Sequence, residues 1–253
     1  MSAFMRALSA EAVKLRGTLA LWMCVIAPAT VAGLLVLQIL LSADGRDVDA
    51  APIDIWTGYA LGTTQLWAYL MLPLFITLQS ALLAGLEHGN QQWKHLLALP
   101  LPKGVHYLAK SAAMVAMLAL AMLVLFALIP LGGWVIATLN PALAKGGSPP
   151  WSLMARNLSS CFAAAMLITA VHTWAAVRWR SFTVAVSLGM TATVIGFLAM
   201  QPDRYGFYFP WSMPAHATAR DASHVGFVVM TGLVGGALVT LAGVLDFVRR
   251  DVD

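Results

Sequence analysis

The sequence predicts an all-α membrane protein with six transmembrane helices, and three observations support this fold class. Hydrophobic residues make up 60% of the 253 residues and charged residues only 10%, whereas soluble domains have roughly 25% charged residues. The mean hydropathy is +0.80. The chain also contains six long apolar runs, in which Asp246 is the only ionised residue. These runs cover residues 19–41, 66–86, 111–139, 158–177, 182–200 and 225–247.

Each run is long enough to cross a bilayer as a helix, for which about 20 residues suffice. The longest segments between the runs, residues 42–65, 87–110 and 201–224, are too short for a separate domain with its own core. We therefore expect a single transmembrane domain over residues 1–253.

The distribution of positive charge predicts that both termini lie in the cytoplasm. Lys and Arg near the ends of membrane helices are retained on that side. With the N-terminus inside, the cytoplasmic set is Arg6, Lys14, Arg16, Lys94, Lys103, Lys110, Arg178, Arg180, Arg249 and Arg250, and the opposite set is Arg46, Lys145, Arg156, Arg204 and Arg220. The basic pI of about 9.3 then reflects topology and contact with anionic headgroups, and nucleic-acid binding is not needed to explain it.

Residues 1–16 predict an amphipathic helix at the cytoplasmic interface. Phe4, Leu8, Ala12 and Leu15 recur at helical spacing, with the charged residues mostly elsewhere. A simple topogenic tail is the alternative. A cleaved secretory signal is a second alternative, but the first apolar run is long for a signal.

The polar insert at residues 87–110 separates two runs that have no charged residues. Each of its charges would cost roughly 2.5–3.5 kcal/mol at the centre of a membrane helix, so the insert must lie in water or among headgroups. Its inner part predicts a short helix with Trp93, Leu96 and Leu97 on one face, ended by Pro100. An exposed apolar face is unfavourable by about 25 cal/mol per Å², which predicts a groove on a soluble partner.

The third run carries Pro130, Gly132 and Gly133 near its outer end, which predicts a kink or an unwound turn there. Runs four and five are joined by residues 178–180 alone, which predicts a tight cytoplasmic hairpin.

The connection at residues 201–224 is rich in aromatic and proline residues. Aromatic side chains favour the headgroup layer, which predicts one or two short re-entrant helices in the outer leaflet. A plain aromatic belt is the alternative. The aromatic residues are Tyr205, Phe207, Tyr208, Phe209 and Trp211.

Motifs for catalysis, nucleotides and metals are absent from the sequence. There is no G-x-x-x-x-G-K-[ST] loop, no H-E-x-x-H and no G-x-S-x-G. The histidines of the insert, and the pair His216 and His224, lack tight spacing with a third ligand. His172, in the fourth run, is expected to be hydrogen-bonded between helices. We therefore predict no catalytic residue and no metal site.

The order of a predicted amphipathic helix, six runs, a cytoplasmic insert after the second run and a re-entrant stretch before the sixth resembles the permease subunits of the ABC type-2 exporter family. Within it, the chain resembles bacitracin and lantibiotic immunity permeases. Their insert reads as an acidic residue, an aromatic, a Leu pair, a Pro, a basic residue, and a Tyr with a Lys. The matching residues are Glu87, Trp93, Leu96, Leu97, Pro100, Lys103, Tyr107 and Lys110. Lys103 stands where Arg is frequent, and a Lys lacks the bidentate fork of Arg.

This resemblance implies a permease in the bacterial cytoplasmic (inner) membrane. It implies that a separate nucleotide-binding subunit hydrolyses ATP with Mg, so that this chain is not an enzyme and holds no cofactor. The permease would pair with a second copy or a sister permease, and would export a hydrophobic or amphipathic substrate such as a peptide antibiotic or a lipid-like molecule. The implied ATPase-coupling residues are Glu87, Trp93, Lys94, Leu96, Leu97, Pro100 and Lys103, and the outer gate is Tyr205, Phe207, Tyr208, Phe209 and Trp211.

Two other functions compete with this hypothesis. A non-transporting scaffold or sensor subunit could use the same insert to dock a cytoplasmic ATPase. A membrane-embedded enzyme would need a titratable cluster inside the bilayer, and the sequence offers too few such residues.

Overall fold

The computed structural model of the chain describes residues 2–43, 55–88, 102–141, 147–179, 181–200, 205–219, 221 and 223–249. Every regular element in these ranges is helical. The elements are α1 (Ala3–Leu15), α2 (Leu19–Ala43), α3 (Ile55–Leu66), η1 (Trp67–Met71), α4 (Leu72–His88), α6 (Lys103–Leu139), α7 (Trp151–Ala164), α8 (Met166–Arg178), α9 (Phe182–Ala199), η2 (Gly206–Tyr208), α10 (Met213–His216) and α11 (Val225–Arg249).

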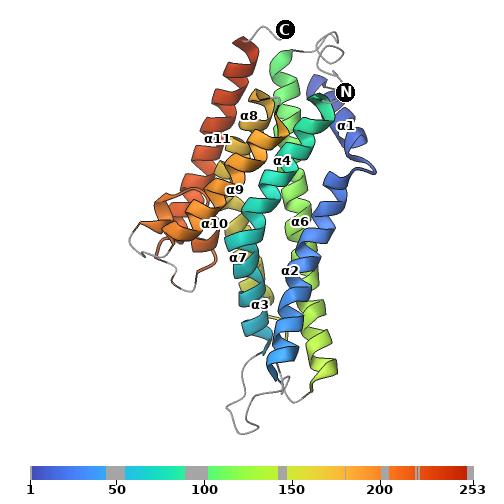
Figure 1. The fold of residues 1–253 in the computed structure, drawn as a ribbon, viewed down its shortest axis with the longest axis vertical. Helices are drawn as coiled ribbons and strands as arrows, with labels where there is room; N and C mark the ends of the chain where they lie inside the picture. The colour runs from blue at the N-terminus through green and yellow to red at the C-terminus, as the bar shows by residue number, and fades with distance from the viewer. Residues whose placement is uncertain are drawn as a thin grey trace.

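Six helices in the described ranges are long and apolar enough to cross a membrane, which confirms the predicted all-α, six-span fold. Two of them are composite, since α3, η1 and α4 form one rod and α7 and α8 form another. The helix α1 and the last turns of α11 lie at the end of the bundle where α4 finishes and α6 begins (Figure 1). Large apolar side chains are exposed along α2, α9 and α11, as expected for helices that face lipid or another membrane subunit.

The helix α1 begins at Ser2, whose hydroxyl accepts a hydrogen bond from the Met5 N–H, a standard N-cap. It buries Ala7, Glu11 and Leu15. A tight turn then joins α1 to α2, because Gly17 adopts a left-handed φ of +72° that other residues rarely adopt.

The second span begins eleven residues earlier than predicted, at Ile55 instead of residue 66. The extra helix α3 contains glycine, threonine and glutamine, which lower its hydropathy. It is nevertheless buried, since Trp56 and Tyr59 are only 7% and 1% exposed and the Tyr59 hydroxyl donates to the carbonyl of Ala32 over 3.0 Å. Burial against α2 and α6 therefore stabilises a helix that hydropathy alone does not identify.

Of the predicted kink or unwound turn in the third span, the unwound turn is wrong, because α6 is helical from Lys103 to Leu139 with Pro130 inside it. Gly132 and Gly133 serve packing instead. A Cβ at Gly132 would lie under 3.0 Å from the Tyr59 ring, and a Cβ at Gly133 would do the same to the Trp56 ring. The two glycines let α3 approach α6 closely.

Small residues also bring α11 against the junction of α7 and α8. A Cβ at Gly232 would meet the backbone of Ala163 and Ala164, and one at Gly236 would meet the backbone of Met166. Glycines four residues apart on one face are typical of close helix packing in membranes. The predicted hairpin is consistent with α8 ending at Arg178 and α9 beginning at Phe182, while Arg180 lies outside the described residues.

Candidate functional site

The structure describes only the borders of the polar insert. Trp93, Lys94, Leu96, Leu97 and Pro100, together with the predicted short helix, lie outside the described residues. At the borders, Glu87 belongs to the last turns of α4, and Lys103 is the first residue of α6.

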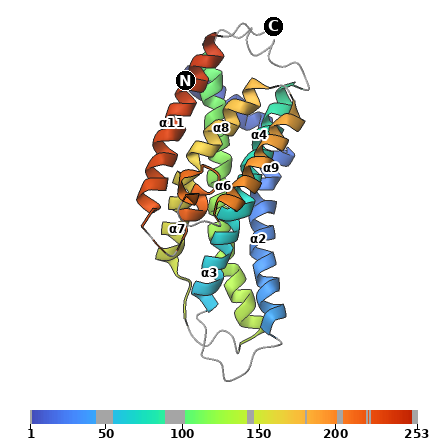
Figure 2. The ribbon, with the colours of Figure 1, turned by 60° about the vertical axis from the view of Figure 1, so that its left-hand side comes forward.

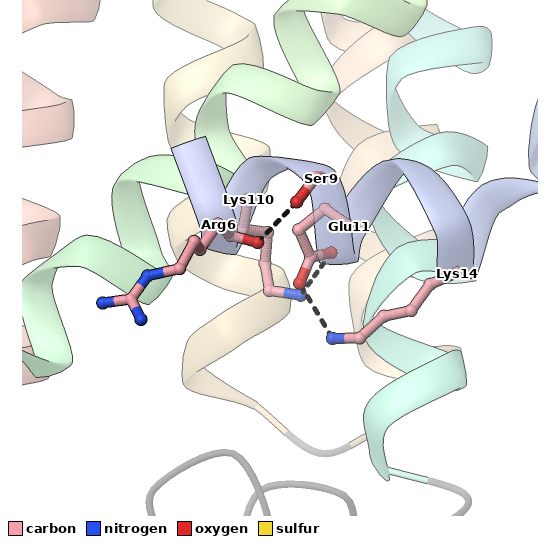
Figure 3. Close-up of polar contacts among 5 residues, drawn as sticks. All are labelled: Arg6, Ser9, Glu11, Lys14 and Lys110. Carbon is pink, nitrogen blue, oxygen red and sulfur yellow. Dashed lines mark hydrogen bonds and ion pairs between the residues drawn. The ribbon is translucent and has the colours of Figure 1, made fainter. Parts of the chain in front are cut away.

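The first turns of α6 are buried. Tyr107 is 2% exposed and packs on Phe247 of α11, with ring centroids 6.1 Å apart, and its hydroxyl lies where a Cβ on Gly243 would be. Lys110 is 4% exposed, and its Nζ lies 4.0 Å from the Glu11 carboxylate of α1 (Figure 3). Two residues of the insert motif therefore hold the start of α6 in place: Tyr107 packs against α11, and Lys110 faces α1.

The second candidate region is the stretch at residues 205–219, here called the 205–219 segment. It contains η2 and α10, and α10 contacts η1, in the middle of the second span, as well as α7 and α11. It lies part-way along α6 rather than at its end, as both views show (Figures 1 and 2). The segment therefore packs against the middle of the second span and lies between the end of α9 and the start of α11 in the chain.

The five aromatic residues predicted as a gate form two groups. Phe207 stacks on His224, with centroids 3.9 Å apart and planes 8° apart, and Tyr208 packs on Phe227 at 5.5 Å. Tyr205 and Tyr208 are mostly exposed. The first group, Phe207 and Tyr208, thus covers the start of α11.

The second group, Phe209 and Trp211, points into the bundle. The Trp211 Nε1–H donates to Nε2 of His172 over 3.2 Å, and the Thr77 hydroxyl lies 3.5 Å from the same nitrogen. His172 and Thr77 are each 2% exposed. Because Nε2 accepts from the indole, the ring proton of a neutral His172 is on Nδ1. This buried polar cluster ties the 205–219 segment to α8 and α4, and it confirms that His172 is hydrogen-bonded between helices.

The cluster has room only because α9 carries Gly189 at this level. A Cβ there would lie under 3.0 Å from both Thr77 and His172. Sequence reasoning missed this contact, since neither the glycine nor the threonine belongs to a recognisable motif.

A cavity of about 450 Å³ lies beside the 205–219 segment. Its wall mixes apolar side chains with Gln65, Tyr69 and Thr218. Gln65 is exposed, and the Tyr69 hydroxyl lies 3.5 Å from the carbonyl of Phe197. Such a lining can accept a molecule with both apolar and hydrogen-bonding parts.

The cavity borders the wide turn η1. Leu72 N–H donates to Trp67 O across five residues, and Pro73, which has no N–H, follows at once. The proline removes the regular hydrogen bond, so the preceding turn widens. Single wide turns of this kind inside α-helices are frequent at functional sites.

The described residues contain no group of three or more potential ligands that could hold a metal ion. His216 and His224 each contact the Phe207 ring. Just before α11, backbone and side-chain hydrogen bonds from Ser223 lower the pKa of Asp221 below its ordinary value, so this exposed carboxylate stays ionised.

Comparison with known protein families identifies a match to the family described as ABC-2 family transporter protein, over residues 7–197. The matched range runs from α1 to α9 and covers more than half of the chain. No curated protein and no solved structure matches the chain.

Proposed function

Because the chain belongs to the ABC-2 transporter family and is thus a multi-pass transmembrane subunit that works with an ABC ATPase, we propose that it is an exporter permease. It resides in the bacterial cytoplasmic membrane, with both termini in the cytoplasm. It forms one transmembrane domain over residues 1–253. Two copies, or one copy and a sister permease, pair to form the transport path.

The observation that carries the export proposal is the position of the 205–219 segment. The segment packs against the middle of the second span, is anchored by Trp211 to His172, and is flanked by a cavity with a mixed lining. If the 205–219 segment moves during transport, the cavity beside it can admit a substrate with apolar and polar parts that enters from the membrane. We therefore assign a hydrophobic or amphipathic substrate, a peptide antibiotic or a lipid-like molecule, as in bacitracin and lantibiotic immunity.

Energy for this movement comes from the partner ATPase, which supplies ATP and Mg. The insert docks on it through Trp93, Leu96 and Leu97. Lys94 and Pro100 belong to the same part of the insert, and Glu87 and Lys103 lie at its borders. Closure of the ATPase displaces the insert, and α4 and α6, which flank it, move with it. The bundle then opens near residues 205–211, part-way along α6.

The test uses the chain purified with its ATPase and reconstituted in liposomes, with bacitracin and a lysophospholipid as probes. The variant Trp93→Ala/Leu97→Ala should lower probe-stimulated ATP hydrolysis and transport at least tenfold while membrane insertion remains normal. The matched control is Trp134→Ala/Leu139→Ala, which changes the same residue types at the other end of α6, where both are exposed. Normal coupling in the insert variant would contradict the proposal.

The alternative function is a non-transporting scaffold or sensor that docks the same ATPase. It predicts co-purification with the ATPase but no ATP-dependent movement of either probe and no stimulation of hydrolysis by them.

A further inference from the structure

A carboxylate and two indole rings meet where α8 and α11 end. The Trp174 Nε1–H of α8 donates to Oδ2 of Asp246 on α11 over 3.2 Å. Trp179, which follows α8, packs on Trp174 with ring centroids 5.4 Å apart and planes 74° apart. We call Trp174, Trp179 and Asp246 the Asp246 corner. Asp246 is the only ionised residue of the six apolar runs, and an ionisable residue in a membrane helix generally marks a functional site.

The Asp246 corner lies close to the ends of both helices, at the level of the lipid headgroups. The helix α11 ends at Arg249 and α8 ends at Arg178. At about 1.5 Å per residue, Asp246 and Trp174 lie roughly 5 and 6 Å from these ends along the helix axes. The last turns of α11 are at the same end of the bundle as α1 (Figure 1). In the proposed topology, this end faces the cytoplasmic leaflet.

The corner can be reached from the lipid side. On α11, Phe247 is buried whereas Leu245 is 56% exposed, and Asp246 lies between these two faces and is partly exposed. Trp174 is also partly buried, and Trp179 is 41% exposed. A headgroup can therefore approach the carboxylate and the rings, with its acyl chain along the exposed side of α11.

These side chains are the parts of a site for a primary ammonium group. The carboxylate supplies the opposite charge and can accept about four hydrogen bonds, so the single bond from the Trp174 indole does not exhaust it. Two indole rings set at a steep angle attract a cation through their quadrupoles. A primary ammonium also donates hydrogen bonds to a carboxylate, whereas a trimethylammonium group has no N–H to donate.

Two arginines at the helix ends suit the phosphate of the same headgroup. Arg178 lies one turn beyond Trp174 on α8, and Arg249 lies three residues beyond Asp246 on α11, so each shares a helix face with its neighbour. Both are exposed, and a guanidinium binds phosphate through paired hydrogen bonds. These arginines serve the phosphate of any phospholipid, so the choice of headgroup falls to the Asp246 corner.

We propose that the Asp246 corner binds the ammonium group of an ethanolamine phospholipid. The ammonium lies against the carboxylate and the indole rings, and the phosphate is held by Arg178 and Arg249. The bound lipid joins the ends of α8 and α11. This site is distinct from the cavity beside the 205–219 segment, and it requires only that the chain lies in a membrane. It therefore goes beyond the export proposal and does not depend on it.

The test is native mass spectrometry of the full chain in detergent with dioleoyl phosphatidylethanolamine or dioleoyl phosphatidylcholine. The two probes share their acyl chains and phosphate and differ in the methyl groups on the nitrogen. The first molecule of the ethanolamine lipid should bind about tenfold more tightly than the choline lipid, because only its ammonium donates a charge-assisted hydrogen bond.

Asp246→Asn removes the charge but keeps an oxygen that accepts from Trp174, and it should lower binding of the ethanolamine lipid to the level of the choline lipid. The matched control is Asp221→Asn, which changes an exposed carboxylate before the start of α11 and should leave the preference unchanged.

Trp179→Leu removes one ring and should weaken binding of the ethanolamine lipid about two- to fivefold, as expected for an exposed cation–π contact. Its matched control is Trp22→Leu, because Trp22 on α2 is also exposed; binding should remain as in the wild type.

Equal binding of the two lipids by the wild type overturns the inference. An undiminished preference in Asp246→Asn also overturns it, since the ethanolamine lipid then binds elsewhere. Should Asp246→Asn fail to insert, the exposed variant Trp179→Leu decides, and wild-type binding of the ethanolamine lipid in that variant overturns the inference. All of these results leave the proposed export function standing.

Discussion

The contact between α4 and α9 at Gly189 gives a prediction whose size follows from the structure. A Cβ at this position would lie under 3.0 Å from Thr77 and 2.7 Å from Cε1 of His172, whereas ordinary contact begins at 3.4 Å. The His172 ring would have to retreat by 0.7 Å, the difference between 3.4 and 2.7 Å, and the Thr77 side chain by more. Both neighbours are buried, and forcing an extra atom into a packed interior typically costs about 1–3 kcal/mol.

The measurement compares Gly189→Ala with Gly33→Ala, a helical glycine on α2 with nothing within 4 Å of an added Cβ. Helix propensity favours Ala over Gly by about 1 kcal/mol at both sites, so their difference isolates packing. We expect Gly189→Ala to be less stable than Gly33→Ala by about 1–3 kcal/mol in unfolding titrations with SDS in mixed micelles.

A double-mutant cycle tests the cause. Thr77→Ala removes the two side-chain atoms nearest to the added Cβ, so Thr77→Ala/Gly189→Ala should be more stable than the sum of the single changes predicts, by roughly 1 kcal/mol or more. Additive effects, or equal stability of Gly189→Ala and Gly33→Ala, would refute the packing argument.

Three further predictions concern single hydrogen bonds or backbone geometry. Trp211→Phe removes the N–H that His172 accepts and should destabilise by about 0.5–1.5 kcal/mol in the same titration, with the exposed Trp134→Phe near zero. Trp174→Phe breaks the 3.2 Å bond to the Asp246 carboxylate and should destabilise by roughly 1.5–3 kcal/mol, as for other bonds to charged groups; an unchanged midpoint would contradict this. Gly17→Ala places a Cβ at a φ of +72° and should cost about 1–2 kcal/mol, whereas a stability gain like that of Gly33→Ala would show that the turn can change its backbone conformation.

Hydropathy predicts the membrane helices well where apolar residues are continuous, as in α2, α6 and α9. It fails for α3, because Gly58, Gly62 and Gln65 interrupt the apolar pattern and the helix is stabilised by tertiary burial of Tyr59. The sequence also predicts an unwound turn at Gly132 and Gly133 that is not present, since a glycine that unwinds a helix and one that admits a neighbouring ring look alike in sequence.

For the candidate site, the sequence predicts which types of residue are present but not which of them contact one another. The aromatic residues at 205–211 stand out in the sequence, but the bond between Trp211 and His172 joins residues 39 positions apart, and no local pattern specifies it. The ion pair of Glu11 with Lys110 likewise depends on how α1 lies on α6. Long-range contacts of this kind follow from packing, which a single sequence does not encode in its local periodicity.

The proposed function depends above all on an insert that faces the cytoplasm and is covered there by an ATPase. Labelling of Lys94→Cys with a membrane-impermeant maleimide tests this placement directly, with Ser148→Cys, an exposed position beyond the opposite end of α6, as the control. We expect no labelling of position 94 in intact cells, labelling in inside-out vesicles stripped of the ATPase, and protection when the ATPase is added back. Labelling of position 94 from outside intact cells would contradict the cytoplasmic placement and the coupling built on it.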